Sequence, residues 1–471
     1  AAGIYIPTLC YHPNLTPYGA CRLCIVEIEK MRGLPTSCTT PASDGMVVRT
    51  NTPQIQELRR DILELILTEH PYVCLTCERK QDCEPYRASI RKVGVTTGCQ
   101  FCPKNGRCEL QEVAEYIGIE EVRLPYEYKE LPIERADPFF ERDYNLCILC
   151  GRCVRVCQEV RGIGAIAFTY RGSEALIGSA FGRTLQESGC QFCGACVDVC
   201  PTGALMERSR KWEGLAERQI VTTCPYCGVG CQLELQVKGE RVIGVTPVDG
   251  VNRGQSCVRG RFGIVEIVHH TQRSKAPMLR RDGELVEVTW DEALDTVASR
   301  ISKYKGDEIA VICCAECTNE DNYILQKLAR VVLNTNNIDH QARLCQAPAV
   351  ASLSQSFGSG AMTNPISEIG EASCILAIGV DITSSHPVVG LEVKRAVDRG
   401  GKLIVINPHR VALCRLADLW LQPRPGTDVA LLGGIMRVIV DQGLLDTSFI
   451  EERCGGFDTF RESLDGFDLD T

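Results

Sequence analysis

The chain uses two different patterns of hydrophobic and polar positions, and the change falls near residue 285. Beyond that point, residues 290–304 are amphipathic and residues 319–334 have a helical pattern, which predicts two helices. Short apolar runs alternate with them, at 308–314, 372–381, 401–408 and 417–423. Each run has the length of a strand, and we expect the last three to be buried strands at intervals suited to parallel α/β units. Gly, Asp, Asn and Pro follow these strands, at the edge where such sheets bind ligands.

Length, charge and hydropathy narrow the class of protein. The 471 residues allow roughly two to four domains. The net charge of −9 argues against a nucleic-acid binder, which would need a basic surface for phosphates. No uninterrupted apolar run approaches about 18 residues, so we expect no membrane span and a cytoplasmic protein.

Cysteine is the residue that stands out, since the chain has 29 of them. Disulfide-dense domains are usually short, so the spacing of these cysteines has to be interpreted in another way. The first group, Cys10, Cys21, Cys24 and Cys38, is spaced C-x10-C-x2-C-x13-C. A long first gap, a tight pair and a distant fourth cysteine suit a loop round a [2Fe–2S] cluster, with zinc as the alternative.

Two cysteine triads with the same spacing, C-x2-C-x5-C, follow 25 residues apart. The triads are Cys74, Cys77, Cys83 and Cys99, Cys102, Cys108. His70 lies four residues before the first triad, and we expect it to complete a four-ligand iron–sulfur site there. The second triad has no such neighbour, so a cluster, a zinc ion and structural thiols all remain open.

Two further runs have the spacing C-x2-C-x2-C-x3-C of bacterial ferredoxins. They are Cys147, Cys150, Cys153, Cys157 and Cys190, Cys193, Cys196, Cys200. In two-cluster ferredoxins the fourth cysteine of each run binds the other cluster. We therefore predict that Cys200 joins the first three cysteines of the first run, and that Cys157 joins those of the second.

The last group in this half is spaced C-x2-C-x3-C-x25-C and consists of Cys224, Cys227, Cys231 and Cys257. Cluster ligation is our interpretation here too. At least five sites in series suit electron transfer better than structural zinc, and such thiols need a reducing compartment.

At this point the motifs carry a resemblance to a family. The segments "CPYCGVGC…SCVRGRFG", "TNEDNYILQKLAR", "GAMTNPISEI", "SSHPVV" and "GTDVALL" resemble the catalytic subunits of iron–sulfur-rich formate dehydrogenases of the molybdenum/tungsten bis-pterin class. The first 215 or so residues are similar to the large iron–sulfur subunit of respiratory complex I and to the matching part of multi-subunit hydrogenases. The order of the cysteine motifs is the same.

The resemblance assigns roles that the residues alone do not. Cys345, which would otherwise be taken as a buried structural thiol, stands where the family carries the metal ligand. Gln346 stands where formate dehydrogenases usually have His, and Arg259 where relatives commonly have a Lys between cluster and pterin. The implied pterin contacts are Cys317, Asn319, Asn322, Gly379, Asp381, His386, Asn407, Arg410, Gly426 and Asp428.

The resemblance also implies cofactors, partners and a fold class. The cofactors would be one [2Fe–2S] cluster, four or five [4Fe–4S] clusters, and a Mo- or W-bis(molybdopterin guanine dinucleotide). The partners would be a flavin subunit that handles NAD(P)H, ferredoxin or a heterodisulfide-reductase-like module, with formate or CO2 as substrate. The fold class is multidomain α/β with small iron–sulfur domains.

We predict five domains along the chain, ending in incomplete molybdopterin oxidoreductase α/β domains. They are a [2Fe–2S] ferredoxin-like domain without its first hairpin (1–68), a His-ligated [4Fe–4S] domain with the extra triad (69–134), a two-[4Fe–4S] ferredoxin domain (135–212), a proximal [4Fe–4S] domain (218–275) and the bis-pterin-binding domains (276–471). The family's "RGQNN"-like segment and its pterin-capping domain do not occur here, so we expect a chain truncated at both ends.

Three functions remain at this stage. The first is a formate dehydrogenase or CO2 reductase subunit that passes electrons from the pterin site along the clusters to a partner. The second is an electron relay with a vestigial, metal-free α/β half, which Gln346 and the short C-terminus favour. The third is a related bis-pterin enzyme with another oxyanion or small substrate.

Overall fold

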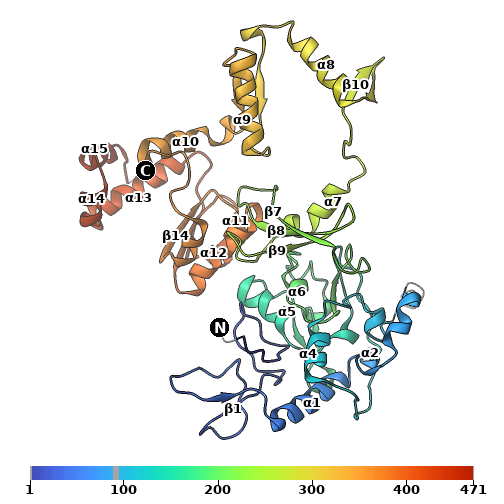
Figure 1. Ribbon diagram of the computed structural model, residues 1–471. Helices are drawn as coiled ribbons and strands as arrows, with labels where there is room; N and C mark the ends of the chain where they lie inside the picture. Colours follow the sequence, from blue (N-terminus) through green and yellow to red (C-terminus); the bar gives the residue numbers. More distant parts are fainter. Residues whose placement is uncertain (1–2, 88–94, 470–471) are drawn as a thin grey trace. The chain divides into compact units, whose positions relative to one another are not determined.

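The computed structural model describes residues 3–87 and 95–469 (Figure 1). It divides into two compact units, residues 1–363 and residues 364–471, and each is described by itself. Among the described residues, no helix is long and apolar enough to cross a membrane.

The first unit begins with a loop that is held on a helix. The short antiparallel strands β1 (Glu27–Ile28) and β2 (Val48–Arg49) stand at its end, and α1 (Pro53–Leu67) follows. Thr52 starts α1 by accepting a hydrogen bond from the Ile55 N–H, with Pro53 in the first turn. Arg59, buried on α1, donates to the Leu23 carbonyl at 2.9 Å and so fastens the loop to the helix.

The next segment packs on the same helix. It contains α2 (Val73–Thr76), the 3₁₀ turns η1 (Lys80–Tyr86) and η3 (Cys99–Phe101), and α4 (Glu109–Ile117). Leu63 and Leu67 of α1 share a buried core with Leu110 and Val113 of α4. Of the described residues between the two helices, Cys108 lies in this core, and Tyr72 and Leu75 pack against it.

The centre of the first unit has a ferredoxin-like arrangement. Strands β3 (Phe140–Arg142) and β6 (Leu205–Glu207) pair antiparallel, as do β4 (Ala167–Thr169) and β5 (Leu176–Gly178). Between them lie α5 (Arg152–Arg155), which continues as the π-helical turn η5 (Val156–Val160), and α6 (Ala195–Asp198). Phe140, Leu146 and Leu205 are in the core that these elements share.

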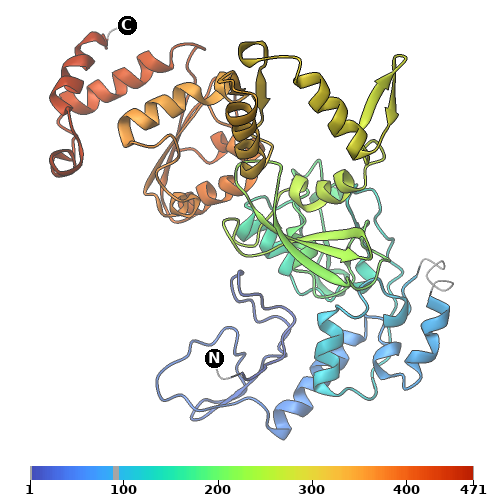
Figure 2. The same ribbon diagram turned by 45° about the horizontal axis from the view of Figure 1, so that its top comes forward.

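A three-stranded antiparallel sheet comes next, and Figure 2 shows its strands side by side. The strands are β7 (Arg218–Thr223), β8 (Gln232–Lys238) and β9 (Arg241–Pro247), with β8 in the middle. The turn η8 (Arg259–Gly263) and α7 (Ile264–Val268) follow the sheet.

The remainder of the first unit begins the α/β part of the chain. It contains the hairpin β10 (Met278–Arg281) and β11 (Glu284–Glu287), α8 (Trp290–Ile301), β12 (Val311–Cys313), α9 (Asn319–Lys327), the π-helical turn η10 (Leu328–Val332), β13 (Ile338–His340) and α10 (Arg343–Phe357). Strands β12 and β13 are parallel.

The second unit is built on a parallel three-stranded sheet in the order β14–β15–β16. Its strands are β14 (Cys374–Ile378), β15 (Lys402–Ile406) and β16 (Leu419–Leu421). Its helices are α11 (Ile382–Ser385), α12 (Pro387–Asp398), α13 (Asp428–Asp441), α14 (Thr447–Arg453) and α15 (Phe457–Ser463). Val393 of α12 packs on Leu403 and Val405 of β15 in its core.

The hydrophobic pattern predicted these elements, with one correction. The expected helices are α8 and α9 with η10, and the four apolar runs contain β12, β14, β15 and β16. The prediction that the last three strands are all buried is wrong. Leu403 and Val405 of the central β15 are fully buried, but β14 and β16 are edge strands whose side chains are half-buried or exposed.

Candidate iron–sulfur relay and pterin site

The sulfur groups have to be judged as cluster sites, because within the described ranges no three His, Cys, Asp or Glu side chains are grouped round a single metal ion. In a four-iron cluster each cysteine binds its own iron, so the ligands need not converge on one point. The question is then which thiols are neighbours and whether they are buried from water.

The first group forms one neighbourhood. Cys24 Sγ lies 3.4 Å from Cys38 Sγ, and the Cys21 N–H donates to Cys10 Sγ at 3.4 Å. The hydrogen bond with Cys10 and the backbone N–H groups round its sulfur lower the pKa of Cys21 to about 5. The same hydrogen bond raises the pKa of Cys10, so it is the closeness of the sulfur atoms that supports a cluster in this loop.

The two ferredoxin runs come together. Cys147, Cys150, Cys153 and Cys200 line one cavity, together with Tyr144, Ile177 and Leu205. Burial, followed by the charges of neighbouring thiols, raises the pKa of Cys150 to about 12. Cys157 is a neighbour of Cys190 and of Cys196, and Cys153 is a neighbour of Cys196 as well. Bound iron would replace the protons that burial favours on these thiols.

The group that begins at Cys224 is also assembled. The Cys224 N–H donates to the Cys231 carbonyl at 2.8 Å. Cys227 and Cys257 are neighbours of both the Cys224 and the Cys231 thiols. Burial raises the pKa of Cys224, and the positive charge of Arg259 opposes that shift. Arg259 thus lies close to this cysteine group.

His70 fits a metal ligand by itself. Its side chain is only 7% exposed, and its Nδ1 is buried without a hydrogen-bond partner. Burial lowers the pKa of His70 to about 4, and a hydrogen bond to the backbone of Leu146 opposes this. A neutral imidazole with one nitrogen on a backbone group and the other unpartnered is the usual arrangement of a ligating histidine.

The cysteine groups are joined by side chains that the spacing could not reveal. Arg261, four residues after Cys257, donates to Glu207 at 2.7 Å and to Asp198 at 2.8 Å. Ser256 donates to the Cys193 carbonyl at 3.4 Å. The Cys257 loop is therefore fixed on the Cys193 loop, and no sequence signal other than the closeness of Arg261 to a cysteine pointed to it.

A second such residue ties the first loop to the ferredoxin region. The Arg155 guanidinium, buried on α5, donates to the Cys10 carbonyl and, at 2.6 Å, to the Thr16 carbonyl. The Thr16 N–H in turn donates to Glu159 at 2.8 Å. The Cys10 group thus lies next to the run that begins at Cys147.

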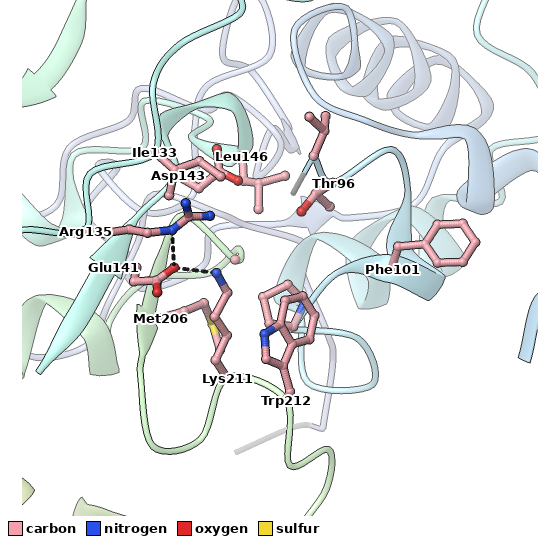
Figure 3. Close-up of a pocket in the computed structure, with 13 residues that line it drawn as sticks. Thr96, Phe101, Ile133, Arg135, Glu141, Asp143, Leu146, Met206, Lys211 and Trp212 are labelled. Atoms are coloured by element: carbon pink, nitrogen blue, oxygen red, sulfur yellow. Dashed lines mark hydrogen bonds and ion pairs between the residues drawn. The ribbon is translucent and has the colours of Figure 1, made fainter. Parts of the chain in front are cut away.

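A cavity of about 330 Å³ opens beside the second triad (Figure 3). Leu146, Gly203 and Trp212 line it, and Glu141 on its wall is paired with Arg135 and Lys211. Pro103 and Phe101, the neighbours of Cys102, form another part of its wall.

The residues implied for the pterin fall in both units. In the first unit Cys317 and Asn319 lie at the start of α9, and Cys345 and Gln346 lie in the first turn of α10, with Cys345 exposed. Asn322 donates to the Cys314 carbonyl at 3.1 Å, and its Oδ1 is buried without a partner.

In the second unit the carboxyl ends of the parallel strands gather three of the expected residues. Gly379 and Asp381 follow β14, and Asn407 follows β15 with its side-chain amide on the Val380 carbonyl at 3.5 Å. Gly379 has a positive φ of 62°, and a side chain there would meet open space. His386 directly precedes α12, and Arg410 lies beyond β15.

Gly426 and Asp428 belong to the same unit. Gly426 has a φ of 87° in the turn after β16, and Asp428 begins α13. An open glycine-containing edge of parallel strands fits a nucleotide, because backbone groups can approach phosphates there. In the first unit, by contrast, Glu320 and Asp321 in the first turn of α9 oppose an anion at that helix end.

Comparison with protein families assigns a class to each part. Residues 217–269 match the molybdopterin oxidoreductase Fe4S4 domain, and residues 273–450 match molybdopterin oxidoreductase. The other matches are a 2Fe-2S iron-sulfur cluster binding domain (1–53), the NADH-ubiquinone oxidoreductase-G iron-sulfur binding region (59–84 and 97–123) and the ferredoxin-like domain of NADH-quinone oxidoreductase subunit 3 (137–206). The chain therefore carries iron–sulfur domains followed by a molybdopterin oxidoreductase domain.

The curated relatives carry the names of oxidoreductases. The chain is 30% identical to "Probable oxidoreductase YjgC" and 32% identical to "Putative formate dehydrogenase YrhE", both of Bacillus subtilis (strain 168). These alignments cover 100% and 99% of this chain but 50% of each relative, so the chain spans about half the length of the curated relatives it matches. Among solved structures it is similar to an NAD+-reducing [NiFe]-hydrogenase, at 29% identity and a TM-score of 0.36 over 44% of this chain and 77% of that one.

Proposed function

We propose that this chain is part of a formate dehydrogenase or CO2 reductase and passes electrons along a series of iron–sulfur clusters. The observation that carries the proposal is the continuity of the cysteine groups. Ser256 and Arg261 join the Cys257 loop to the Cys193 loop, and Arg155 joins the Cys147 run to the Cys10 loop. Electron transfer needs such a series, whereas structural metal sites do not.

The ligand sets we propose follow these neighbourhoods. The [2Fe–2S] cluster would be held by Cys10, Cys21, Cys24 and Cys38. The two ferredoxin-type clusters would be held by the crossed sets, and the proximal cluster by Cys224, Cys227, Cys231 and Cys257. His70 would serve a further [4Fe–4S] cluster with cysteines of the triads.

At the other end of the series, Cys345 would bind molybdenum or tungsten. The strand ends that carry Gly379, Asp381 and Asn407 would contact the guanine nucleotides. When bound, the metal–pterin group supplies two-electron redox chemistry, and the protein's part is to orient substrate and to lead electrons away. Gln346 beside Cys345 can hydrogen-bond a carboxylate, but it cannot take a proton near neutral pH as imidazole can.

The partner would accept electrons at the Cys10 end. Residues 59–84, 97–123 and 137–206 match complex I domains, and this match supports a partner subunit that handles NADH. A flavin protein is the class of partner we propose, because it can collect single electrons and deliver a pair as hydride.

A formate assay tests the proposal. The native protein, purified without oxygen, should lose visible cluster absorbance when formate is added. If dithionite bleaches the clusters and formate does not, the relay function, with a metal-free α/β half, replaces the formate proposal. Gln346 is the observation that keeps that second function open.

A further inference from the structure

The two cysteine triads lie in different surroundings. Cys77 ends α2, and Cys83 lies within η1, where the residues from Glu78 to Asp82 and from Glu84 to Tyr86 are exposed. The second triad is placed on the core instead. Cys108 directly precedes α4 and is buried, since it packs with Leu110 and Val113.

The second triad is also the one that meets the ferredoxin region. Cys108 Sγ lies 3.5 Å from the Pro201 carbonyl, directly after Cys200. A side chain at Gly203 would meet Cys102 Sγ at 2.9 Å and the Leu146 side chain at 3.1 Å. Cys102 therefore lies beside Leu146, which directly precedes Cys147. Cys108 lies beside Pro201, which directly follows Cys200. Both cysteines thus adjoin the set formed by Cys147, Cys150, Cys153 and Cys200.

His70 reaches the same wall. Its ring is bonded to the backbone of Leu146, the residue whose side chain flanks Gly203 beside Cys102. Its other ring nitrogen, Nδ1, is buried and has no partner.

Cys74 lies on the backbone of the second triad's loop. The Gln100 N–H donates to Cys74 Sγ at 3.5 Å, and a side chain at Gly98 would meet that sulfur at 2.6 Å. Cys74 also lines a cavity of about 480 Å³ together with Cys99 and Cys108, so the first cysteine of the first triad lies beside the second triad.

We propose that one [4Fe–4S] cluster is held by His70, Cys99, Cys102 and Cys108, and that Cys77 and Cys83 hold none of its iron. This rests on the proposed function, because it presumes that the chain binds clusters in series. The cluster would then adjoin the set formed by Cys147, Cys150, Cys153 and Cys200 through Pro201 and Gly203. The first triad would serve as a packed and partly exposed segment round it.

Iron content and electron paramagnetic resonance of the full chain test the proposal. Two matched double variants are compared with the parent, Cys77→Ala with Cys83→Ala, and Cys102→Ala with Cys108→Ala. We expect the first pair to keep the iron content and the spectrum of the reduced protein. We expect the second to lose about four iron atoms and one cluster signal. Retention of the remaining signals shows that each variant is folded.

The opposite result, loss of iron from the first pair alone, overturns the proposal, and so does a loss of about four atoms from each pair. The histidine is tested separately. His70→Ala should alter or remove the same signal, while Cys74→Ala should leave it, and the reverse result overturns the assignment of His70. A parent protein without iron would instead contradict the proposed function, so the two failures are distinguishable.

Discussion

Arg261 and Glu207 form an ion pair of 2.7 Å in which both side chains are almost completely buried, at 2% and 3% exposure. They are 54 residues apart and belong to different cysteine groups. The same guanidinium forms a second ion pair, with Asp198 at 2.8 Å. The pair therefore fixes the loop of Cys257 on the ferredoxin region, and the distance between two proposed clusters depends on it.

Removing this arginine should destabilise the junction. Arg261→Met leaves two carboxylates without their partner, and breaking a buried pair in this way costs about 3–5 kcal/mol. The urea concentration at which half of the cluster absorbance is lost should fall, whereas Arg49→Gln, which breaks only exposed pairs with Glu27 and Glu29, should leave it unchanged.

The added substitutions Asp198→Asn and Glu207→Gln should restore part of the lost stability in the Arg261→Met background, since they remove the stranded charges. If the triple variant is no more stable than Arg261→Met, the buried pair is not the cause.

Gly194 should tolerate no side chain. It has a φ of 78°, and a Cβ there would meet Arg261 Cγ at 2.8 Å. We expect Gly194→Ala to cost about 1–3 kcal/mol from overpacking in addition to backbone strain. Gly182→Ala is the matched control, because Gly182 has a φ of 65° but open space around it. In urea titrations, the midpoint concentration of Gly194→Ala should be clearly lower than that of the control. Equal midpoints would contradict the contact between Gly194 and Arg261.

The crossing of the ferredoxin ligands gives a spectroscopic prediction. Cys200→Ala should lose the same paramagnetic signal as Cys153→Ala, because both belong to the cavity set. Cys157→Ala should lose the same signal as Cys196→Ala. Spectra of the four dithionite-reduced variants decide this. If Cys200→Ala pairs with Cys196→Ala, each run binds its own cluster and the crossed assignment is wrong.

Arg155 should govern how firmly the first cluster is held. Arg155→Met removes two hydrogen bonds to the Cys10 loop and leaves the buried Cys10 carbonyl unsatisfied, at about 1–3 kcal/mol. We expect faster loss of the [2Fe–2S] absorption in the presence of a chelator. Arg22→Gln, at a residue of the same loop that is exposed, should lose it at the parent's rate. Equal rates for all three proteins would contradict the role of Arg155.

The sequence was informative where ligands are close together in the chain. The ferredoxin runs carried their own spacing rule, which named Cys157 and Cys200. The structure places Cys200 in one cavity with Cys147, Cys150 and Cys153, and the crossed ligand sets stay a prediction. The hydrophobic pattern likewise predicted the parallel strands β14, β15 and β16. Local spacing and periodicity are properties of short segments, so one sequence suffices to recognise them.

Relationships between distant segments were not predictable in this way. The position of His70 before the first triad predicted a site with Cys74, Cys77 and Cys83. The assignment of His70 to the second triad that we propose rests instead on contacts of distant segments, such as those of Leu146 and Gly203. Arg155 and Arg261 were missed for the same reason, since their partners are far away in the chain. The burial of β14 and β16 was overestimated because apolar content does not say which strand is at the edge.

The pterin ligand is the residue whose role depends most on resemblance. Cys345→Ala should abolish bleaching of the clusters by formate and leave bleaching by dithionite intact. Cys454→Ala, another exposed thiol beyond α14, should retain both. Formate-dependent bleaching in Cys345→Ala would contradict the assignment of Cys345 as the metal ligand.

The most direct test of the whole account is elemental analysis of the native protein, purified without oxygen, for Mo, W, Zn and Fe per chain. We expect close to one Mo or W and about 18 Fe, from one [2Fe–2S] and four [4Fe–4S] clusters. Iron at that level with neither heavy metal would contradict the pterin site and leave a relay protein with Cys345 as a structural thiol.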